Sequence, residues 1–231
     1  MLAVPANCNC RSPASELRQI FAEVNPSSCP KKFNFHLHTV FSDGKMEPCD
    51  LVDQAIALGV QHFAITDHHT IEGYLIADKY LQSLRECSPN ATEMCCLWAG
   101  VEINASLLFT EVHILAYGFD PHHPAIQPYI QGKPTAGLEY QAVNVIHAIH
   151  CAGGLAVLAH PARYRRSVEE LIPPAASIGI DGVETYYGYD NSDPWLPSAK
   201  QSEQVRLLSE RYGLLSTCGT DSHGFKITRR L

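Results

Sequence analysis

The chain has 231 residues, 45% of them hydrophobic, which suits one large α/β domain or two small ones with a buried core. Its formal net charge of −7 disfavours a broad nucleic-acid-binding face, although metal ions can still attract a small anionic substrate. No apolar run reaches the roughly 18 residues that a membrane-spanning helix needs, and residues 1–12 lack the apolar core of a signal peptide.

The nine cysteines show no spacing typical of a secreted disulfide scaffold. We therefore expect reduced thiols and a cytoplasmic protein. Cys8 with Cys10, and Cys95 with Cys96, each lack a second matching pair, so we expect no separate cysteine metal site.

Residues 1–30 are predicted to be an extension that carries a short helix. Ser12 and Pro13 can begin this helix. Its apolar positions recur at helical spacing: Leu17, Ile20, Phe21 and Val24. We expect this apolar side to pack on a main domain that spans residues 31–231, with a docking helix for a partner as the alternative.

From residue 33 onward, the pattern predicts about seven strands that mostly alternate with helices. Strands are expected over 33–38, 62–66, 94–103, 111–119, 155–161, 181–187 and 214–223. Helices are expected over 48–58, 71–85, 138–151, 167–176 and 198–212. This alternation indicates an α/β fold with a mostly parallel sheet, either open or closed into a barrel.

Histidine and carboxylate residues follow many of these strands. His36 and His38 lie two apart, so a strand places both imidazoles on one face, and Asp43 follows in a Ser-Asp-Gly turn. Further candidates lie at the predicted strand ends: His68, Glu102, His160, Asp221 and His223. Because all strand ends of a barrel meet at one mouth, whereas an open sheet gathers ligands only at its switch point, this distribution favours the barrel.

With His113, which lies within a predicted strand, the set contains six histidines and three carboxylates. Imidazole with carboxylate suits zinc, manganese or iron, whereas calcium prefers oxygen ligands alone. Nine ligands are too many for one ion and would serve two or three divalent ions. Three such ions with three carboxylates leave a net positive pocket, which attracts phosphate.

The ordered motifs resemble those of the PHP (polymerase and histidinol phosphatase) domain family. The resemblance lies in His-Leu-His with Ser-Asp-Gly, Thr-Asp-His, Gly-Val-Glu, the histidine of VHILAYGF, Ala-His-Pro and Thr-Asp-Ser-His, from about Phe35 to Gly224. It implies a distorted (β/α)7 barrel with a trinuclear metal site at the C-terminal ends of the strands. The segment between His113 and His160 is shorter than expected for nucleotide-acting relatives, which are expected to carry an inserted subdomain there.

The resemblance also implies a role for each ligand. A first ion would be held by His36, His38, Glu102 and Asp221. Glu102 would bridge to a second ion, held also by His113 and His160. A third ion would be held by Asp43, His68 and His223. The catalytic residues would be those of the first ion, acting through a metal-bound hydroxide that attacks phosphorus.

Other polar residues receive weaker assignments. Arg163 follows Ala-His-Pro and can fork onto phosphate oxygens, with a surface ion pair as the equally weighted alternative. Asp67 is expected to orient a ligand, and Glu184 faces either the pocket or a structural partner. Lys45, Arg165 and Arg166 are weaker candidates for substrate binding. The tyrosines 186, 187 and 189 are expected to pack, and structural roles are expected for His69, His122, His123, His147 and His150.

The leading prediction is metal-dependent hydrolysis of a phosphate ester, with a small phosphorylated metabolite or a nucleotide as substrate. Two alternatives stay open. One is an exonuclease that acts on 5′-phosphorylated oligonucleotide ends, and the other is a non-catalytic metal-binding regulatory module. The sequence leaves the physiological substrate, the metal, the general acid, protein partners and the oligomeric state undetermined.

Overall fold

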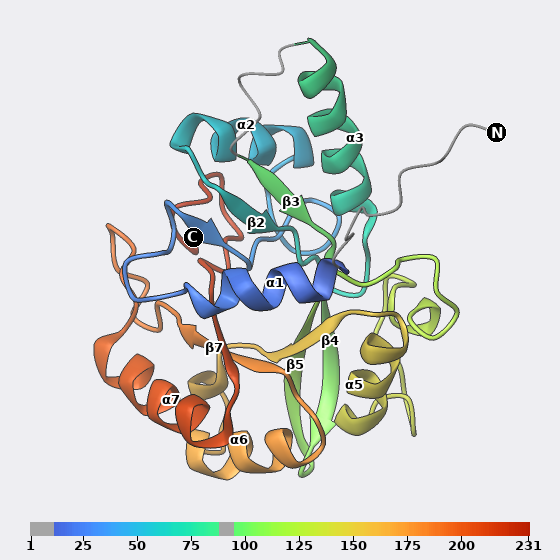
Figure 1. The fold of residues 1–231 in the computed structure, drawn as a ribbon, viewed down its shortest axis with the longest axis vertical. Coiled ribbons are helices and arrows are strands. Elements are labelled where there is room, and N and C mark those ends of the chain that lie inside the picture. Colours follow the sequence, from blue (N-terminus) through green and yellow to red (C-terminus); the bar gives the residue numbers. More distant parts are fainter. Residues whose placement is uncertain (1–11, 88–94) are drawn as a thin grey trace, which may run out of the picture.

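The computed structural model describes residues 12–87 and 95–231. The chain forms a mixed α/β fold, as expected, in which the strands build two sheets (Figure 1). The first sheet has the order β1-β2-β3 and the second the order β4-β5-β6-β7-β8. Cys8, Cys10 and the first part of the predicted extension lie outside the described residues.

The first sheet is parallel throughout. It contains β1 (Phe33–Asn34), β2 (His62–Ala64) and β3 (Cys96–Trp98). The helices α2 (Pro48–Leu58) and α3 (Glu72–Cys87) pack on it. Gly59 ends α2 in the left-handed conformation, with φ of 70°, as its position after the apolar pattern predicts.

The second sheet is mixed. It contains β4 (Gly100–Leu107), β5 (Thr110–Tyr117), β6 (Leu155–Leu158), β7 (Gly182–Tyr186) and β8 (Leu215–Cys218). Pairing is antiparallel between β4 and β5 and between β5 and β6, and parallel from β6 to β8. The mostly parallel arrangement therefore holds for most strand pairs but fails around β5, because β4 and β5 form a hairpin with no helix between them.

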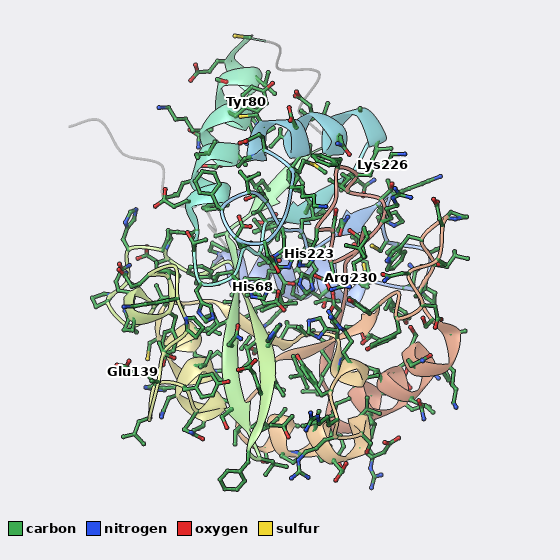
Figure 2. All side chains as sticks on the ribbon, turned by 180° about the vertical axis from the view of Figure 1, so that it is seen from behind. His68, Tyr80, Glu139, His223, Lys226 and Arg230 are labelled. Carbon is green, nitrogen blue, oxygen red and sulfur yellow. The ribbon has the colours of Figure 1, made fainter. Side chains whose placement is uncertain are left out.

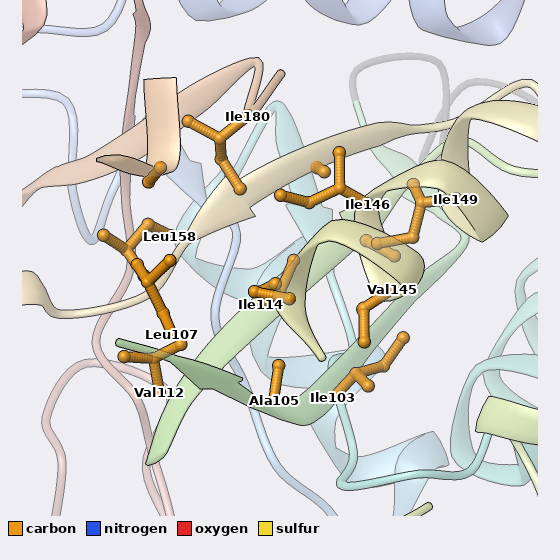
Figure 3. Packing of buried hydrophobic residues seen from close by; sticks show 14 of the residues in the cluster. Ile103, Ala105, Leu107, Val112, Ile114, Val145, Ile146, Ile149, Leu158 and Ile180 are labelled. Atoms are coloured by element: carbon orange, nitrogen blue, oxygen red, sulfur yellow. The ribbon is translucent and has the colours of Figure 1, made fainter. Parts of the chain in front are cut away.

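The helices α5 (Ala142–Cys151), α6 (Val168–Ser177) and α7 (Ala199–Tyr212) pack on the second sheet. Figure 3 shows side chains of β4, β5 and α5 meeting in one apolar cluster. Helix α5 begins at Ala142, later than the predicted 138. Tyr140 and Gln141 instead pair with Ser106 at the end of β4, and Gln141 is extended. Two one-turn 3-10 helices, Gln127–Tyr129 and Pro161–Arg163, lie in the connecting loops.

Helix α1 (Pro13–Ala22) begins after Ser12, whose hydroxyl accepts a hydrogen bond from the Ser15 N–H. Leu17 and Phe21 are fully buried, and the Phe21 ring packs edge-on against Phe35. Figure 1 shows α1 lying across the region where the two sheets meet. The predicted packing of this helix on the main body is thus present.

Isolated bridges connect the two sheets. Leu37 pairs with Ser222, which brings the continuation of β1 beside the continuation of β8, and His68 pairs with Glu102. The first approach depends on Gly219, because a Cβ there would lie 2.2 Å from the Cβ of His36. Within the described residues, no helix is both long and apolar enough to cross a membrane.

Candidate metal centre

His36 and His38 lie on the short extended segment that follows β1. Their neighbours Phe35 and Leu37 point to the opposite side and are fully buried in apolar clusters, so the alternation fixes both imidazoles on the other face. Both imidazoles are themselves buried, with 0% and 1% exposure, and their ring centroids are 5.1 Å apart.

Glu102 is the centre of the cluster. It is the third residue of β4 rather than the last residue of its strand, because β4 continues to Leu107. Its Oε2 lies 2.9 Å from His36 Nε2 and 3.1 Å from His38 Nε2. Its Oε1 lies 2.7 Å from His113 Nδ1 and 3.2 Å from His160 Nε2. His68 Nε2 is 3.6 Å from Oε2, so one buried carboxylate contacts five imidazoles.

Asp221 lies beside Glu102, and its two carboxylate oxygens contact different groups. Its Oδ1 is 3.4 Å from His36 Nε2 and 3.2 Å from His38 Nε2. Its Oδ2 accepts hydrogen bonds from Tyr187 Oη at 2.6 Å, Arg230 Nε at 2.8 Å and Arg163 Nη1 at 3.0 Å. These three donors hold the carboxylate with Oδ1 toward the imidazoles.

Asp43, His68 and His223 complete the cluster on its exposed side. His223 Nε2 is 3.1 Å from Asp43 Oδ2, and His68 Nε2 is 3.9 Å from the same oxygen. Asp67, fully buried, holds the turn that carries Asp43 by accepting hydrogen bonds from the Thr39 N–H and hydroxyl and from the Ser42 hydroxyl. Asp67 therefore holds the turn of a candidate ligand, and its role in orienting a bound ligand stays a prediction.

Glu184, at the centre of β7, supports the cluster from behind. Its Oε1 is 3.0 Å from His36 Nδ1, and its Oε2 accepts a hydrogen bond from the His160 backbone N–H at 2.8 Å. The first contact favours the tautomer of His36 that leaves Nε2 free to face Glu102 and Asp221. Of the two alternatives for this residue, the buried supporting role applies.

Two of these residues have backbone conformations that non-glycine residues rarely adopt. The φ angle is +26° at His160 and +53° at Asp221. Such conformations are unfavourable unless the surroundings determine them, and they gather at functional sites. Here the Glu184 carboxylate and the His36 carbonyl bind the N–H groups of these two residues.

The charges in the cluster influence one another strongly. Burial alone would lower the pKa of His38, but the carboxylates of Asp221 and Glu102 outweigh it and raise this pKa to about 9. The pKa of His36 is likewise raised well above its ordinary value by Glu102, Glu184 and Asp221. Burial and the neighbouring imidazoles lower the pKa of His68 to about 4. In both Glu102 and Asp221, the histidines outweigh the effect of burial and hold the carboxyl pKa well below its usual range.

Three overlapping groups have donor atoms close enough together to hold a metal ion, with all donor atoms of a group within 4.8 Å of one another. They are His36, His38, Glu102 and Asp221; His38, Asp43, His68 and His223; and His68, Glu102 and His113. The first group contains the same residues as the predicted site of the first ion. The second group contains the residues predicted for the third ion together with His38. In the last group His68 takes the place predicted for His160, although His160 also contacts Glu102.

The donor chemistry fits divalent transition metals, since neutral imidazole and carboxylate are their preferred nitrogen and oxygen ligands. A second observation agrees. The Nε2 atom of His38 is buried and has no hydrogen-bond partner among the described residues, although two carboxylates lie near it. A buried polar atom without a partner is unfavourable, and a metal ion would satisfy it.

Other residues considered in the sequence make either structural contacts or contacts with a candidate ligand. His69 contacts Asn104, and His150 in α5 pairs with Asp181 at 2.7 Å, which are structural contacts as expected. Tyr187 does more than pack, because it holds Asp221. Arg166 contacts Thr110 and Glu170.

Arg230 was not identified from the sequence. Nothing in the local pattern Thr-Arg-Arg indicates a site, and only the folding of residues 224–231 back onto His223 brings Arg230 to Asp221. Seen from behind, His68 lies on one side of His223 and Arg230 on the other (Figure 2).

The profile of the PHP domain family matches residues 34–226 of this chain. A 5′-3′ exoribonuclease from Haemophilus influenzae is 24% identical and covers 84% of this chain and 90% of its own length. A 3′,5′-nucleoside bisphosphate phosphatase from Chromobacterium violaceum is 23% identical, and the alignment covers 82% of this chain and 86% of the phosphatase. A solved structure from Bifidobacterium adolescentis, described as a candidate metal-dependent phosphoesterase, is 24% identical to this chain. The superposition covers 84% of this chain and 88% of the other, with a TM-score of 0.66.

The exoribonuclease alignment also indicates a difference in length. It spans 265 positions, whereas 84% of the 231 residues is about 194, so roughly 70 positions have no counterpart in this chain. The phosphatase alignment, at 262 positions, shows a similar excess. These relatives therefore have positions that this chain lacks, and their place between His113 and His160 stays a prediction.

Proposed function

The chain belongs to the PHP domain family, and we propose that it is a metal-dependent phosphoesterase that hydrolyses a small phosphorylated metabolite or a nucleotide. The observation that carries this proposal is the shared contact of five imidazoles with the buried carboxylate of Glu102. The names of the relatives, a bisphosphate phosphatase and an exoribonuclease, support the same chemistry.

We propose that the centre holds two or three divalent ions of manganese, zinc or iron. The nine residues assigned to them are His36, His38, Asp43, His68, Glu102, His113, His160, Asp221 and His223. The three overlapping donor groups support this assignment, and so does the buried His38 Nε2, which lies within 3.2 Å of two carboxylates without a well-directed hydrogen bond. When bound, such ions lower the pKa of a water molecule and neutralise charge on phosphoryl oxygens.

The protein itself contributes orientation and charge. Glu184 sets the tautomer of His36, and Asp67 fixes the turn that presents Asp43. Arg163 and Arg230 each use one nitrogen on Asp221 Oδ2, which leaves further N–H groups on two partly exposed guanidinium groups. We assign Arg163 the binding of phosphoryl oxygens, since guanidinium pairs with phosphate in a bidentate manner, and Arg230 lies where it can assist.

We further propose that the two sheets form one distorted (β/α)7 barrel. The bridges from Leu37 to Ser222 and from His68 to Glu102 support this, because they join β1 to β8 and β2 to β4. The barrel domain would comprise residues 31–231, and residues 1–30 would be an extension whose helix α1 covers the side away from the metal centre, as Figures 1 and 2 indicate.

An exonuclease acting on 5′-phosphorylated oligonucleotide ends is the second candidate function, favoured by the name of the Haemophilus relative. The net charge of −7 argues against long polymers but allows one terminal residue to enter. A non-catalytic metal-binding module is the remaining alternative, and the names of the relatives, an exoribonuclease and a phosphatase, speak against it. We propose a cytoplasmic location, supported by the free thiols of all seven cysteines in the described residues.

The test combines metal analysis with a substrate panel. Asp221→Asn and His38→Ala are expected to lose manganese- or zinc-dependent phosphatase activity while the far-UV circular dichroism spectrum stays unchanged. The panel contains a mononucleotide, a bisphosphorylated nucleotide, histidinol phosphate and a 5′-phosphorylated oligonucleotide. A well-folded Asp221→Asn protein with full turnover would show the assignment to be wrong.

A further inference from the structure

A cleft of about 450 Å³ adjoins the candidate metal centre. Asp43, His68 and His113 form its inner wall, so any group in the cleft lies beside candidate metal ligands. Its volume is in the range of small-molecule binding sites. The outer walls are formed by Phe41, Ser42, His69, Asn104, Gly132 and Pro134.

Phe41 is the aromatic wall of this cleft. The side chain is 39% exposed, although phenylalanine is usually buried. Its backbone is not free to move the ring away, since the Phe41 N–H donates to the Thr39 hydroxyl, which in turn is bound by the buried Asp67. The backbone at Phe41 is thus held beside the cleft, and the partly exposed ring lines the cleft with an apolar surface.

Asn104 supplies a polar group to the same cleft. It lies two residues after Glu102 on β4, so the strand alternation places both side chains on the same face. Its Oδ1 is 3.0 Å from His69 Nε2, while its other amide atom makes no hydrogen bond within the described residues. An aromatic side chain and an amide group that line one cleft suit a flat ring with hydrogen-bonding groups at its edge.

The charges fix the direction in which a substrate would lie. Arg163 and Arg230 contact Asp221, and neither lines the cleft. His68, which does line it, lies on the other side of His223 from Arg230 (Figure 2). A phosphoryl group bound near the arginines and the metal centre therefore directs the rest of the ester toward Phe41.

We propose that this cleft binds the leaving group of the substrate, and that Phe41 makes it selective for a leaving group that carries a flat heteroaromatic ring, such as a nucleoside. The proposal rests on the proposed phosphoesterase function and names its substrate class. Stacking of a base on an aromatic side chain tolerates any base, so selectivity among bases is not expected.

The test compares two esters that differ only in the base, adenosine 5′-monophosphate and ribose 5-phosphate. The wild-type protein is expected to show a kcat/KM about tenfold or more higher for the nucleotide. Phe41→Ala should remove most of this preference, because it should lower kcat/KM for the nucleotide and leave kcat/KM for ribose 5-phosphate unchanged. Phe41→Leu should behave similarly, whereas Phe41→Trp should retain the preference. Phe109→Ala, which removes a fully exposed ring on the β4–β5 turn, is the matched control and should change neither value.

A second measurement separates this proposal from the phosphoesterase function. Adenosine is titrated into chelator-treated protein by calorimetry, with ribose as the control ligand. Binding of adenosine that Phe41→Ala weakens about tenfold supports the subsite even without turnover. Hydrolysis of both esters with an equal kcat/KM, or equal losses on both in Phe41→Ala, overturns the subsite and leaves the phosphoesterase function intact. Failure of the wild-type protein to hydrolyse either ester or any other substrate of the panel, with adenosine still bound through Phe41, overturns the phosphoesterase function instead. Absence of adenosine binding together with an equal kcat/KM for both esters overturns the subsite.

Discussion

Substitution of Glu184 by glutamine tests whether the metal centre depends on a residue that contacts no substrate. Glu184 is fully buried and accepts from two donors, His36 Nδ1 and the His160 N–H. Glutamine has the same shape but offers one acceptor oxygen and one NH2 group. One of the two donors would then face another donor, and its hydrogen bond would be lost.

The size of the effect follows from the type of bond. A hydrogen bond to a charged, buried acceptor contributes roughly 1.5–3 kcal/mol, equivalent to about a 10- to 150-fold change in an equilibrium constant. Residues that orient metal-binding histidines typically change metal affinity by about 10- to 100-fold when replaced. We therefore expect Glu184→Gln to bind manganese or zinc at least about tenfold more weakly than the wild-type protein.

The assay is a titration of metal-free protein against a chelator of known affinity, at constant pH. The control is Glu203→Gln, which alters an exposed ion pair with Arg206 on α7 and should leave metal affinity unchanged. Circular dichroism and thermal unfolding of both variants separate weaker binding from unfolding. Wild-type metal affinity in a folded Glu184→Gln protein would refute the role assigned to this carboxylate.

Two further predictions concern stability. Neighbouring carboxylates raise the pKa of His38 from 6.5 to about 9. Protonated His38 therefore stabilises the metal-free protein, fully below about pH 6.5, and this stabilisation is lost as the pH rises through 9. The loss amounts to at most about 3 kcal/mol. Urea unfolding of chelator-treated protein should therefore show a lower midpoint at pH 9.5 than at pH 6.5, and a flat profile would contradict this. Gly73 is in the first turn of α3, where a Cβ would lie 2.2 Å from Asp67 Oδ2 and 2.7 Å from Thr39 Oγ1. Gly73→Ala should lower the free energy of unfolding by about 1–3 kcal/mol in urea. In an ordinary exposed helix the same change raises the stability by about 1 kcal/mol. A stabilised variant would exclude this packing.

The candidate ligands were accessible from the sequence because of where they occur. His36, His38 and His160 each follow or continue a short apolar strand, and strand periodicity decides the face of the first two. Residues at the ends of neighbouring strands are brought together by the sheet itself. This reasoning needs only local patterns and a fold class, both of which the sequence supplies.

The supporting residues were less accessible. Glu184 contacts His36, which is 148 residues away in the sequence, whereas Arg230, nine positions after Asp221, reaches it because the chain between them folds back. Both contacts depend on side-chain direction within a packed interior. The β4–β5 hairpin was also missed as an antiparallel pair. Its turn contains Leu108 and Phe109, both at positive φ, instead of the glycine or asparagine that usually marks such a turn. Pattern reasoning finds residues with distinctive chemistry, whereas these contacts are decided by tertiary packing.

The close approach at Gly219 has a consequence for protein synthesis. His36 and His38 leave the ribosome early, whereas Asp221, on the segment that Gly219 admits beside them, is made more than 180 residues later. Until then the two imidazoles lack Asp221, one of the two carboxylates that both of them contact in the folded protein. On the proposed assignment, full loading with metal therefore follows translation of the segment after β8, and a ribosome-bound fragment that stops before Asp221 carries only part of the candidate ligand set.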